Sequence, residues 1–232
     1  YDISTETGTN SSDVYDPAAA NAALEELGWK DYDANPATPR VAKGVVNVPD
    51  GTVFSVALYT SEDAKDLAIA EEIRSSLMTC GIQIEVKALP PAELYAEGPE
   101  GVLFGRKFDL ALIPWHIGES LPCALFESEE IPAEDNYWIG MNDGGGNIAG
   151  YQNSAFDALC NSARYGSNEQ GEAFHAQVEA GKILDNETPF ISLFFDAKTI
   201  LANSQLCFSN IMNTQGYPYS TLEYWDFRDT CK

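Results

Sequence analysis

The residues best suited to hold a ligand follow an apolar run, Phe108 to Pro114. Trp115 offers a flat ring on which a solute can stack, and His116 offers a hydrogen bond or a metal ligand. Tyr137 and Trp138 add two rings in the same long connection. Two interpretations are open: the rings line a ligand cleft, or they close the edge of the core and anchor the loop. We expect no bound metal, because a lone histidine in a loop is seldom a ligand.

The chain lacks the arrangements that nucleophilic catalysis needs. A Ser-His-Asp assembly requires a histidine beside a nucleophile, yet the sequence has only His116 and His175, and it has no G-x-S-x-G motif. The glycine-rich run 142–147 lacks both the Lys-Ser/Thr of a P-loop and the acid spacing of an EF-hand, so we interpret it as a flexible turn. Paired carboxylates are conceivable in so acidic a chain, but no pattern places two together. We therefore expect that this protein is not an enzyme and that it binds no cofactor.

The charge of the chain limits the classes of partner that it can bind. Its 232 residues include 13 Lys+Arg and 36 Asp+Glu, a formal net charge of -23. Such a field repels nucleic acids and anionic membrane surfaces, and no apolar run approaches the ~20 residues of a membrane span. The excess of acids serves solubility or attracts cationic ligands, and the overall charge does not distinguish the two.

The elements that must position these residues alternate between strand and helix. We expect a strand at 52–59, a helix from Ser61 to Thr79, a strand at 82–88, a short helix after Pro90-Pro91 and a buried strand at 108–114. This βαβαβ order winds right-handed around a parallel sheet. The sequence therefore predicts an α/β fold with a small, mostly parallel sheet flanked by helices.

The remaining segments complete one domain over residues 1–232, with a lead-in loop at 1–14, an α/β core at 15–206 and an aromatic tail at 207–232. A capped helix begins at Asp16-Pro17 and ends at Gly28. A strand at 41–48 should pair with 52–59 around the turn at 49–51. Two helices are expected at about 154–164 and 169–186, and a buried strand at 189–195.

Five cysteines are present: Cys80, Cys123, Cys160, Cys207 and Cys231. None forms a C-x-x-C pair, which argues against a zinc ribbon or a redox motif. Cys80 is expected to be a buried free thiol. The other four allow three pairings, of which we favour Cys123 with Cys160 and Cys207 with Cys231. Bridges fit an oxidising compartment outside the cytoplasm, and the alternative that all five are reduced stays open.

The order of elements and motifs resembles the peptide- and nickel-type (family 5) solute-binding proteins of ABC transporters. The matching segments, in the family's order, are 15–29 (YDP, AAL and LGW), 49–51 (PDG), 77–86 (LMTCGIQIEV), 108–115 (FDLALIPW), 151–159 (YQNSAFDAL) and 185–194 (DNETPFISLF). Family members are more than twice as long, so the resemblance identifies this chain as the C-terminal lobe only. The start at Tyr1 rather than Met agrees with an upstream segment having been removed, or with an excised piece.

The resemblance implies a bilobed protein that closes on an oligopeptide or similar solute and delivers it to a transporter permease. Such proteins are periplasmic or lipid-anchored, so it implies an extracytoplasmic location, with any anchor on the missing N-terminal part. In relatives an acid three positions past the tryptophan meets the peptide amino group. Here that position is Gly118, so Glu119 takes the role only if the loop bulges. The alternative is an acidic extracellular interaction module that reuses the lobe without a transport ligand.

Overall fold

A computed structural model describes residues 15–115, 121–136, 138, 146–165, 170–194, 206–207 and 226–227. Three strands form a parallel sheet in the order β4-β3-β5; their bounds are Ser55–Ser61 for β3, Gln83–Leu89 for β4 and Leu110–Ala111 for β5. β3 pairs with β4 along its whole length, from Ser55 opposite Gln83, and with β5 near its end, where Tyr59 lies opposite Ala111. The predicted α/β fold with a mostly parallel sheet is confirmed.

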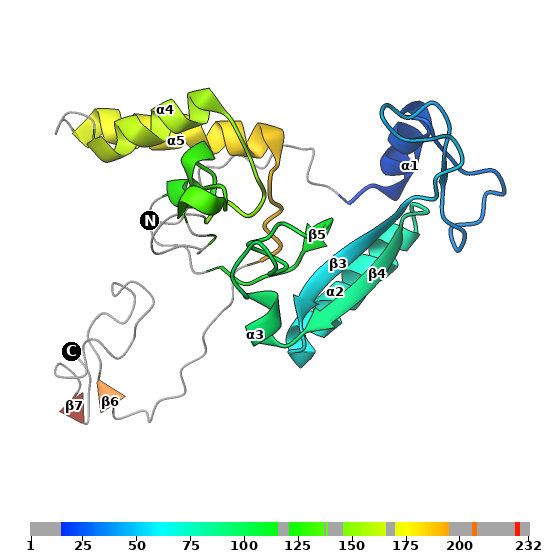
Figure 1. Cartoon of the computed structure of the whole chain (residues 1–232), viewed down its shortest axis with the longest axis horizontal. Coiled ribbons are helices and arrows are strands. Elements are labelled where there is room, and N and C mark those ends of the chain that lie inside the picture. The colour runs from blue at the N-terminus through cyan, green and yellow to red at the C-terminus, as the bar shows by residue number, and fades with distance from the viewer. Residues whose placement is uncertain are drawn as a thin grey trace.

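Helix α2 (Ala64–Met78) connects β3 to β4 and covers one face of the sheet (Figure 1). Its start is fixed by Asp63, whose carboxylate accepts a hydrogen bond from the backbone N–H of Lys65 at 2.8 Å. Ala70 is fully buried against the sheet. After the helix, Gly81 takes a φ of 71° where an added Cβ would lie 2.9 Å from Cγ of Arg40. Only glycine fits there without strain.

The opposite face of the sheet is covered by α3 (Pro91–Leu94) and by the irregular segment after it. Leu94 and Leu103 are fully buried there, with Ile148 from much later in the chain. Burial of apolar side chains is the main favourable term in folding. One face of the sheet is thus stabilised by a helix and the other largely by irregular segments.

The first described segment forms α1 (Pro17–Glu26) and an antiparallel ribbon of β1 (Trp29–Lys30) with β2 (Val41–Ala42). Asp16 caps α1 as the sequence predicts, because its side chain accepts a hydrogen bond from the Ala19 N–H at 3.0 Å.

The predicted strand at 41–48 is wrong beyond residue 42. The Val48 N–H donates to the Val45 carbonyl in a turn, and Asn47 has a φ of 61°, which is incompatible with a strand. What is left of the predicted hairpin is a single bridge between Val41 and Val53 with a few neighbouring hydrogen bonds.

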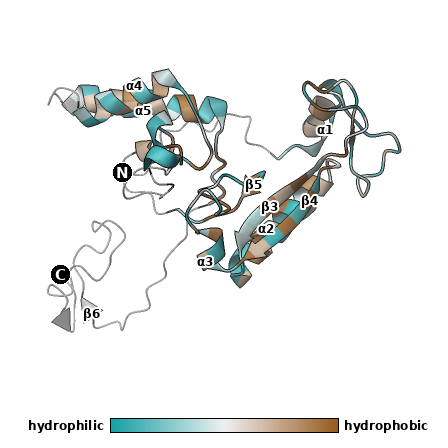
Figure 2. Ribbon diagram, viewed as in Figure 1, coloured by the Kyte–Doolittle hydropathy of each residue, from teal (hydrophilic) through white to brown (hydrophobic). Residues whose placement is uncertain are grey.

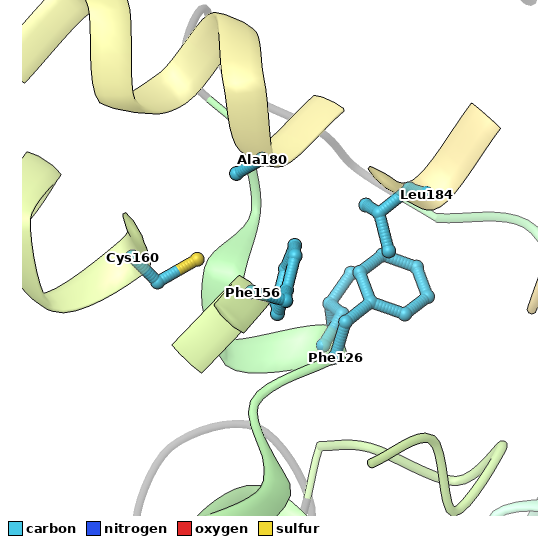
Figure 3. Close-up of a cluster of buried hydrophobic side chains, with 6 residues drawn as sticks. Phe126, Phe156, Cys160, Ala180 and Leu184 are labelled. Carbon is cyan, nitrogen blue, oxygen red and sulfur yellow. The ribbon is translucent and has the colours of Figure 1, made fainter. Parts of the chain in front are cut away.

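Helices α4 (Ser154–Tyr165) and α5 (Gln170–Glu187) lie side by side, within one residue of their predicted bounds (Figure 1). Hydrophilic and hydrophobic residues alternate along both, as expected for helices with one buried side (Figure 2). An apolar cluster joins the pair to the segment before it (Figure 3). Its buried members are Leu125, Phe126, Phe156, Cys160, Ala180 and Leu184.

A disulfide joins Cys123 to Cys160, with the two Cα atoms 5.8 Å apart. This is one of the two pairs expected, and Cys80 is a buried free thiol, as predicted. Cys207 lies in β6 (Leu206–Cys207), which pairs antiparallel with β7 (Asp226–Phe227). Cys231, like the lead-in at 1–14 and most of the tail, lies outside the described residues. The pairing of Cys207 with Cys231 stays a prediction.

The predicted buried strand from Pro189 to Phe195 is wrong over residues 189–194, which form no strand and are mostly exposed; Phe195 lies outside the described part. Ile191 is 80% exposed. Phe190 instead stacks on Phe126, with ring centroids 4.9 Å apart. A strand requires a neighbour for its backbone hydrogen bonds, and no strand that the structure describes pairs with this segment.

Candidate functional site

The carboxyl edge of the parallel sheet is the first candidate site. The chain leaves β3 for α2 on one face, whereas after β5 it passes to the opposite face, where Trp115 packs with Leu94 and Leu103. In open α/β sheets, ligands bind outside the carboxyl ends of the strands, where neighbouring connections diverge to opposite faces. This topology therefore makes the edge between the ends of β3 and β5 the place where a ligand is expected to bind.

Two hydrogen bonds fix the segment that carries Trp115. The Leu112 N–H donates to the Tyr59 carbonyl at 2.8 Å, and the hydroxyl of the fully buried Thr60 donates to the Leu112 carbonyl at 3.2 Å. The backbone three residues before Trp115 is thus tied to the central strand. These hydrogen bonds therefore hold the backbone that leads to Trp115 at the carboxyl edge of the sheet.

Acidic groups follow the end of β3. The Ser61 hydroxyl donates to Asp66 Oδ2 at 2.6 Å and accepts from the Asp63 N–H at 3.1 Å. Burial, and then the negative charge of Asp66, raise the pKa of Tyr95 above its usual value. Glu62 and Asp63 are exposed at the same edge. The carboxylates give the edge a negative field, which favours ligands that carry N–H donors or positive charge.

Trp115 is half-buried and contacts two separate apolar clusters. On one side it packs with Leu94, Leu103 and Ile148, and on the other with the α4–α5 cluster. Its ring meets Phe126 edge-on at a centroid distance of 5.8 Å and lies 6.4 Å from the ring of Phe190. These contacts favour the core-edge interpretation for the packed part of the indole.

Trp138 supports the loop-anchor interpretation. Its carbonyl accepts a hydrogen bond from the Gly98 N–H at 3.3 Å, and its N–H donates to the Ala133 carbonyl at 3.0 Å. The indole lies directly against Gly98, because a Cβ added there would be 2.7 Å from Cε3. His116, Glu119 and Tyr137 lie outside the described residues, so their predicted roles stay predictions.

Sequence reasoning missed a groove of about 800 Å³ on the face of the sheet that carries Tyr59. One wall is the edge strand β4 from Glu85 to Leu89; the other is formed by Glu93, Glu97, Glu100 and Val102. The available signal was the alternation along β4, in which Ile84 and Val86 face α2 while Glu85 and Lys87 do not.

Among the described residues that line this groove, one cation, Lys87, lies beside four glutamates. The Lys87 ammonium is 3.5 Å from a Glu85 carboxylate oxygen and 5.5 Å from the centroid of the Tyr59 ring. The charge of Glu85, followed by that of Tyr59, raises the pKa of Lys87. On the opposite wall Glu100 pairs with Lys107 at 2.6 Å. The groove therefore has a negative net charge.

Neither a metal centre nor a membrane-spanning helix is found in the part of the chain that the structure describes. No group of three or more His, Cys, Asp or Glu side chains is arranged to hold a metal ion there. Within the same ranges, no helix has both the length and the apolar character needed to cross a membrane.

No protein-family model and no curated protein matches the sequence. Solved structures do match part of it. An oligopeptide-binding protein from Thermus thermophilus, complexed with a pentapeptide, is 19% identical with a TM-score of 0.59, over 73% of this chain and 28% of that protein. The periplasmic oligopeptide-binding protein of an oligopeptide ABC transporter from Thermotoga maritima is 24% identical with a TM-score of 0.57, over 76% and 30%. NikA from Brucella suis, in complex with Fe(III)-EDTA, is 19% identical with a TM-score of 0.55, over 74% and 30%.

These likenesses establish the fold. About three quarters of this chain has the α/β architecture found in part of these periplasmic binding proteins. The chain spans only 28% to 30% of the length of the three structures.

Proposed function

We propose that this chain is the C-terminal lobe of an ABC-transporter solute-binding protein, and that it captures oligopeptides or similar solutes at the carboxyl edge of its sheet. The whole of residues 1–232 belongs to this lobe. The observation that carries the proposal is the coincidence of a periplasmic-binding-protein fold with a half-buried tryptophan at the carboxyl end of β5. That is where ligands bind in open α/β sheets.

The chemistry of the edge supports a solute with N–H groups. Glu62 and Asp66 present carboxylate oxygens, while Trp115 presents an apolar ring. Peptides carry both backbone N–H donors and apolar side chains. We extend the site to His116, Glu119 and Tyr137, with Trp138 as an anchor of the long connection that carries them.

The Cys123–Cys160 disulfide supports an extracytoplasmic location, since such bonds persist in oxidising compartments. In that location the binding partner is a transporter permease, which would engage the form closed on solute. A solute held by one wall alone stays largely exposed and gains little from desolvation. This chain alone should therefore bind solute weakly, and the full bilobed protein tightly.

The test is a thermal-shift screen of the full-length protein that contains this chain, with separate pools of di- to hexapeptides, oligosaccharides and metal chelates. A ligand that binds only the native state raises the melting temperature. We expect the peptide pool to raise it. Calorimetry on residues 1–232 with the same peptides should then give much weaker binding. Tight binding by this chain alone would contradict its assignment as half of a site.

A pair of matched variants assigns the effect to the carboxyl edge. Trp115→Phe keeps an aromatic ring between the two clusters but shortens the exposed indole, so the peptide-induced shift should shrink. Trp29→Phe is the control, because Trp29 stacks on Phe54 at 4.1 Å beside the amino ends of the strands. Equal shifts in both variants would remove Trp115 from the site. A well-folded protein that responds to no pool would instead favour an interaction module.

A further inference from the structure

The groove along β4 has a second property, which concerns the backbone. β4 is an edge strand in the described sheet, paired with β3 on one side only. The Gln83 N–H donates to the Phe54 carbonyl, and the Leu89 carbonyl accepts from the Glu62 N–H. Odd-numbered residues of β4 therefore direct their backbone groups toward β3. By alternation, Ile84, Val86 and Ala88 direct theirs outward.

The outward groups of Val86 and Ala88 border the groove itself. Five consecutive residues, 85–89, line it, so the strand's main chain forms the wall as well as its side chains. Outward N–H and C=O groups along an edge strand are a template for another strand. Natural edges are usually blunted by proline, by a bulge or by a free lysine. Residues 83–89 contain no proline, and the single lysine, Lys87, is engaged with Glu85 and Tyr59.

The charge of the groove indicates which kind of segment can bind there. Four glutamates, at positions 85, 93, 97 and 100, border the groove, and only Glu85 and Glu100 have a cation paired with them among the described residues. A second copy of this chain would bring the same acids, and a net charge of -23, against these glutamates. Like charges brought together across an interface disfavour that pairing. An extended segment that carries lysine or arginine is instead attracted to these glutamates.

We propose that β4 binds an extended, basic peptide segment as a fourth strand of the sheet, with its backbone on Val86 and Ala88 and its cationic side chains toward Glu93 and Glu97. Strand addition of this kind takes affinity from main-chain hydrogen bonds and specificity from neighbouring side chains. The site lies on the edge and face of β4, whereas the proposed solute site lies beyond the carboxyl ends of β3 and β5. It does not depend on the solute site.

The test is a fluorescence-anisotropy titration of this chain with a labelled Val-Lys-Val-Lys-Val-Lys peptide at low salt. Ala88→Pro removes one outward donor and leaves the inward ladder intact, because proline is tolerated where the N–H of an edge strand faces solvent. We expect affinity to fall about tenfold in Ala88→Pro. Glu93→Gln with Glu97→Gln should lower affinity and flatten its salt dependence. Glu26→Gln with Glu129→Gln, which removes the same two charges from exposed positions elsewhere, should change neither.

Three controls separate backbone pairing from charge attraction and from the solute site. The same peptide with alternate backbone nitrogens methylated should bind weakly, and a Val-Glu repeat should not bind. Trp115→Phe should leave binding of the lysine peptide unchanged. Unaltered binding to Ala88→Pro, or equal binding of the methylated peptide, would overturn strand addition. Binding lost in Trp115→Phe but kept in Ala88→Pro would move the peptide to the solute site and overturn this proposal while leaving the other intact.

Discussion

Arg40 donates a hydrogen bond to Glu25 Oε1 at 2.7 Å and thereby joins the β2 segment to the end of α1. The arginine is only 4% exposed. Its other guanidinium hydrogen bonds go to the Cys80 carbonyl, the Trp29 carbonyl and the Asn21 side chain, at 2.7 to 2.8 Å. One side chain therefore connects α1 and β1 to the turn that ends α2. Arg40 links the N-terminal segment to the sheet.

Replacing Arg40 by alanine should lower the free energy of unfolding by about 3 kcal/mol, because the buried acceptors lose their donors. Equilibrium denaturation in urea measures the change. Arg74→Ala is the control, since Arg74 pairs with Glu71 on the exposed side of α2, and exposed pairs contribute little. A similar loss in both variants would mean that the Arg40 network has no special role.

Acid should weaken the same junction. The backbone N–H of Asp31, and then Lys30 and Arg40, lower the pKa of Glu25 to about 2. In the unfolded chain a glutamate titrates near 4.3, so the stabilisation is fully present above that pH and is lost as the pH falls toward 2. Glu25→Gln should therefore differ most from the wild type near neutral pH and converge with it in acid. Denaturation midpoints of both proteins from pH 6 to pH 2 measure this, and a constant difference would refute the assignment.

The sequence predicted the βαβ part of the fold because its signals are local. Gly81 marks the end of α2, and the alternation of 82–88 defines β4 to within one residue. The predicted helix start at Ser61 is wrong, because Ser61 is the last residue of β3 and Asp63 caps the helix instead. The failure at 189–194 has the opposite cause: an apolar run becomes a strand only where a sheet edge accepts it, and here Phe190 packs on Phe126 instead. Local pattern does not reveal which edge is available.

The candidate sites, like the fold, were predictable only where the signal is local. Trp115 was identified because it follows the apolar run 108–114, which was predicted as a buried strand. Only Leu110–Ala111 of that run is a strand, and Leu110 is 39% exposed. The contact of Trp115 with two clusters depends on Ile148 and on α4 and α5, which come later in the chain. The groove on β4 was missed because no local pattern in the sequence connects glutamates 93, 97 and 100 with β4. Only the folded chain brings them opposite Lys87 and the open strand edge. Individual residues could be nominated from sequence, whereas their grouping required tertiary contacts.

The Cys123–Cys160 bond should contribute strongly to stability. It closes a loop with a sequence separation of 37 residues, and the chain-entropy relation gives roughly 4 kcal/mol for a loop of that size. Cys123→Ala with Cys160→Ala should lower the unfolding free energy by about that amount. Cys80→Ala is the control for losing a buried sulfur without losing a bond. Peptide mapping without reductant checks the pairing, and a free Cys123 would contradict it.

Asn147 is fully buried and uses both ends of its amide. Its Nδ2 donates to the Glu127 carbonyl at 2.9 Å and to the Tyr151 carbonyl at 2.8 Å, while Oδ1 accepts from the Tyr151 N–H at 3.1 Å. The side chain thereby holds the segment before α4 against the turn at 127–130. These contacts also fix which amide atom is the nitrogen, because two carbonyl oxygens require a donor.

Asn147→Asp should therefore destabilise the protein by about 3 kcal/mol or more, since a carboxylate oxygen would face two buried carbonyls without a donor. Asn35→Asp is the matched control: the exposed Asn35 accepts from the Ala37 N–H through Oδ1, and aspartate keeps that bond. Both variants add the same charge, so their difference in unfolding free energy isolates the buried donor. Stability should recover in part below the pKa of the new carboxyl, where a protonated aspartic acid can donate to one carbonyl. Equal stability of the two variants at neutral pH would show that the Asn147 amide does not hold this junction together.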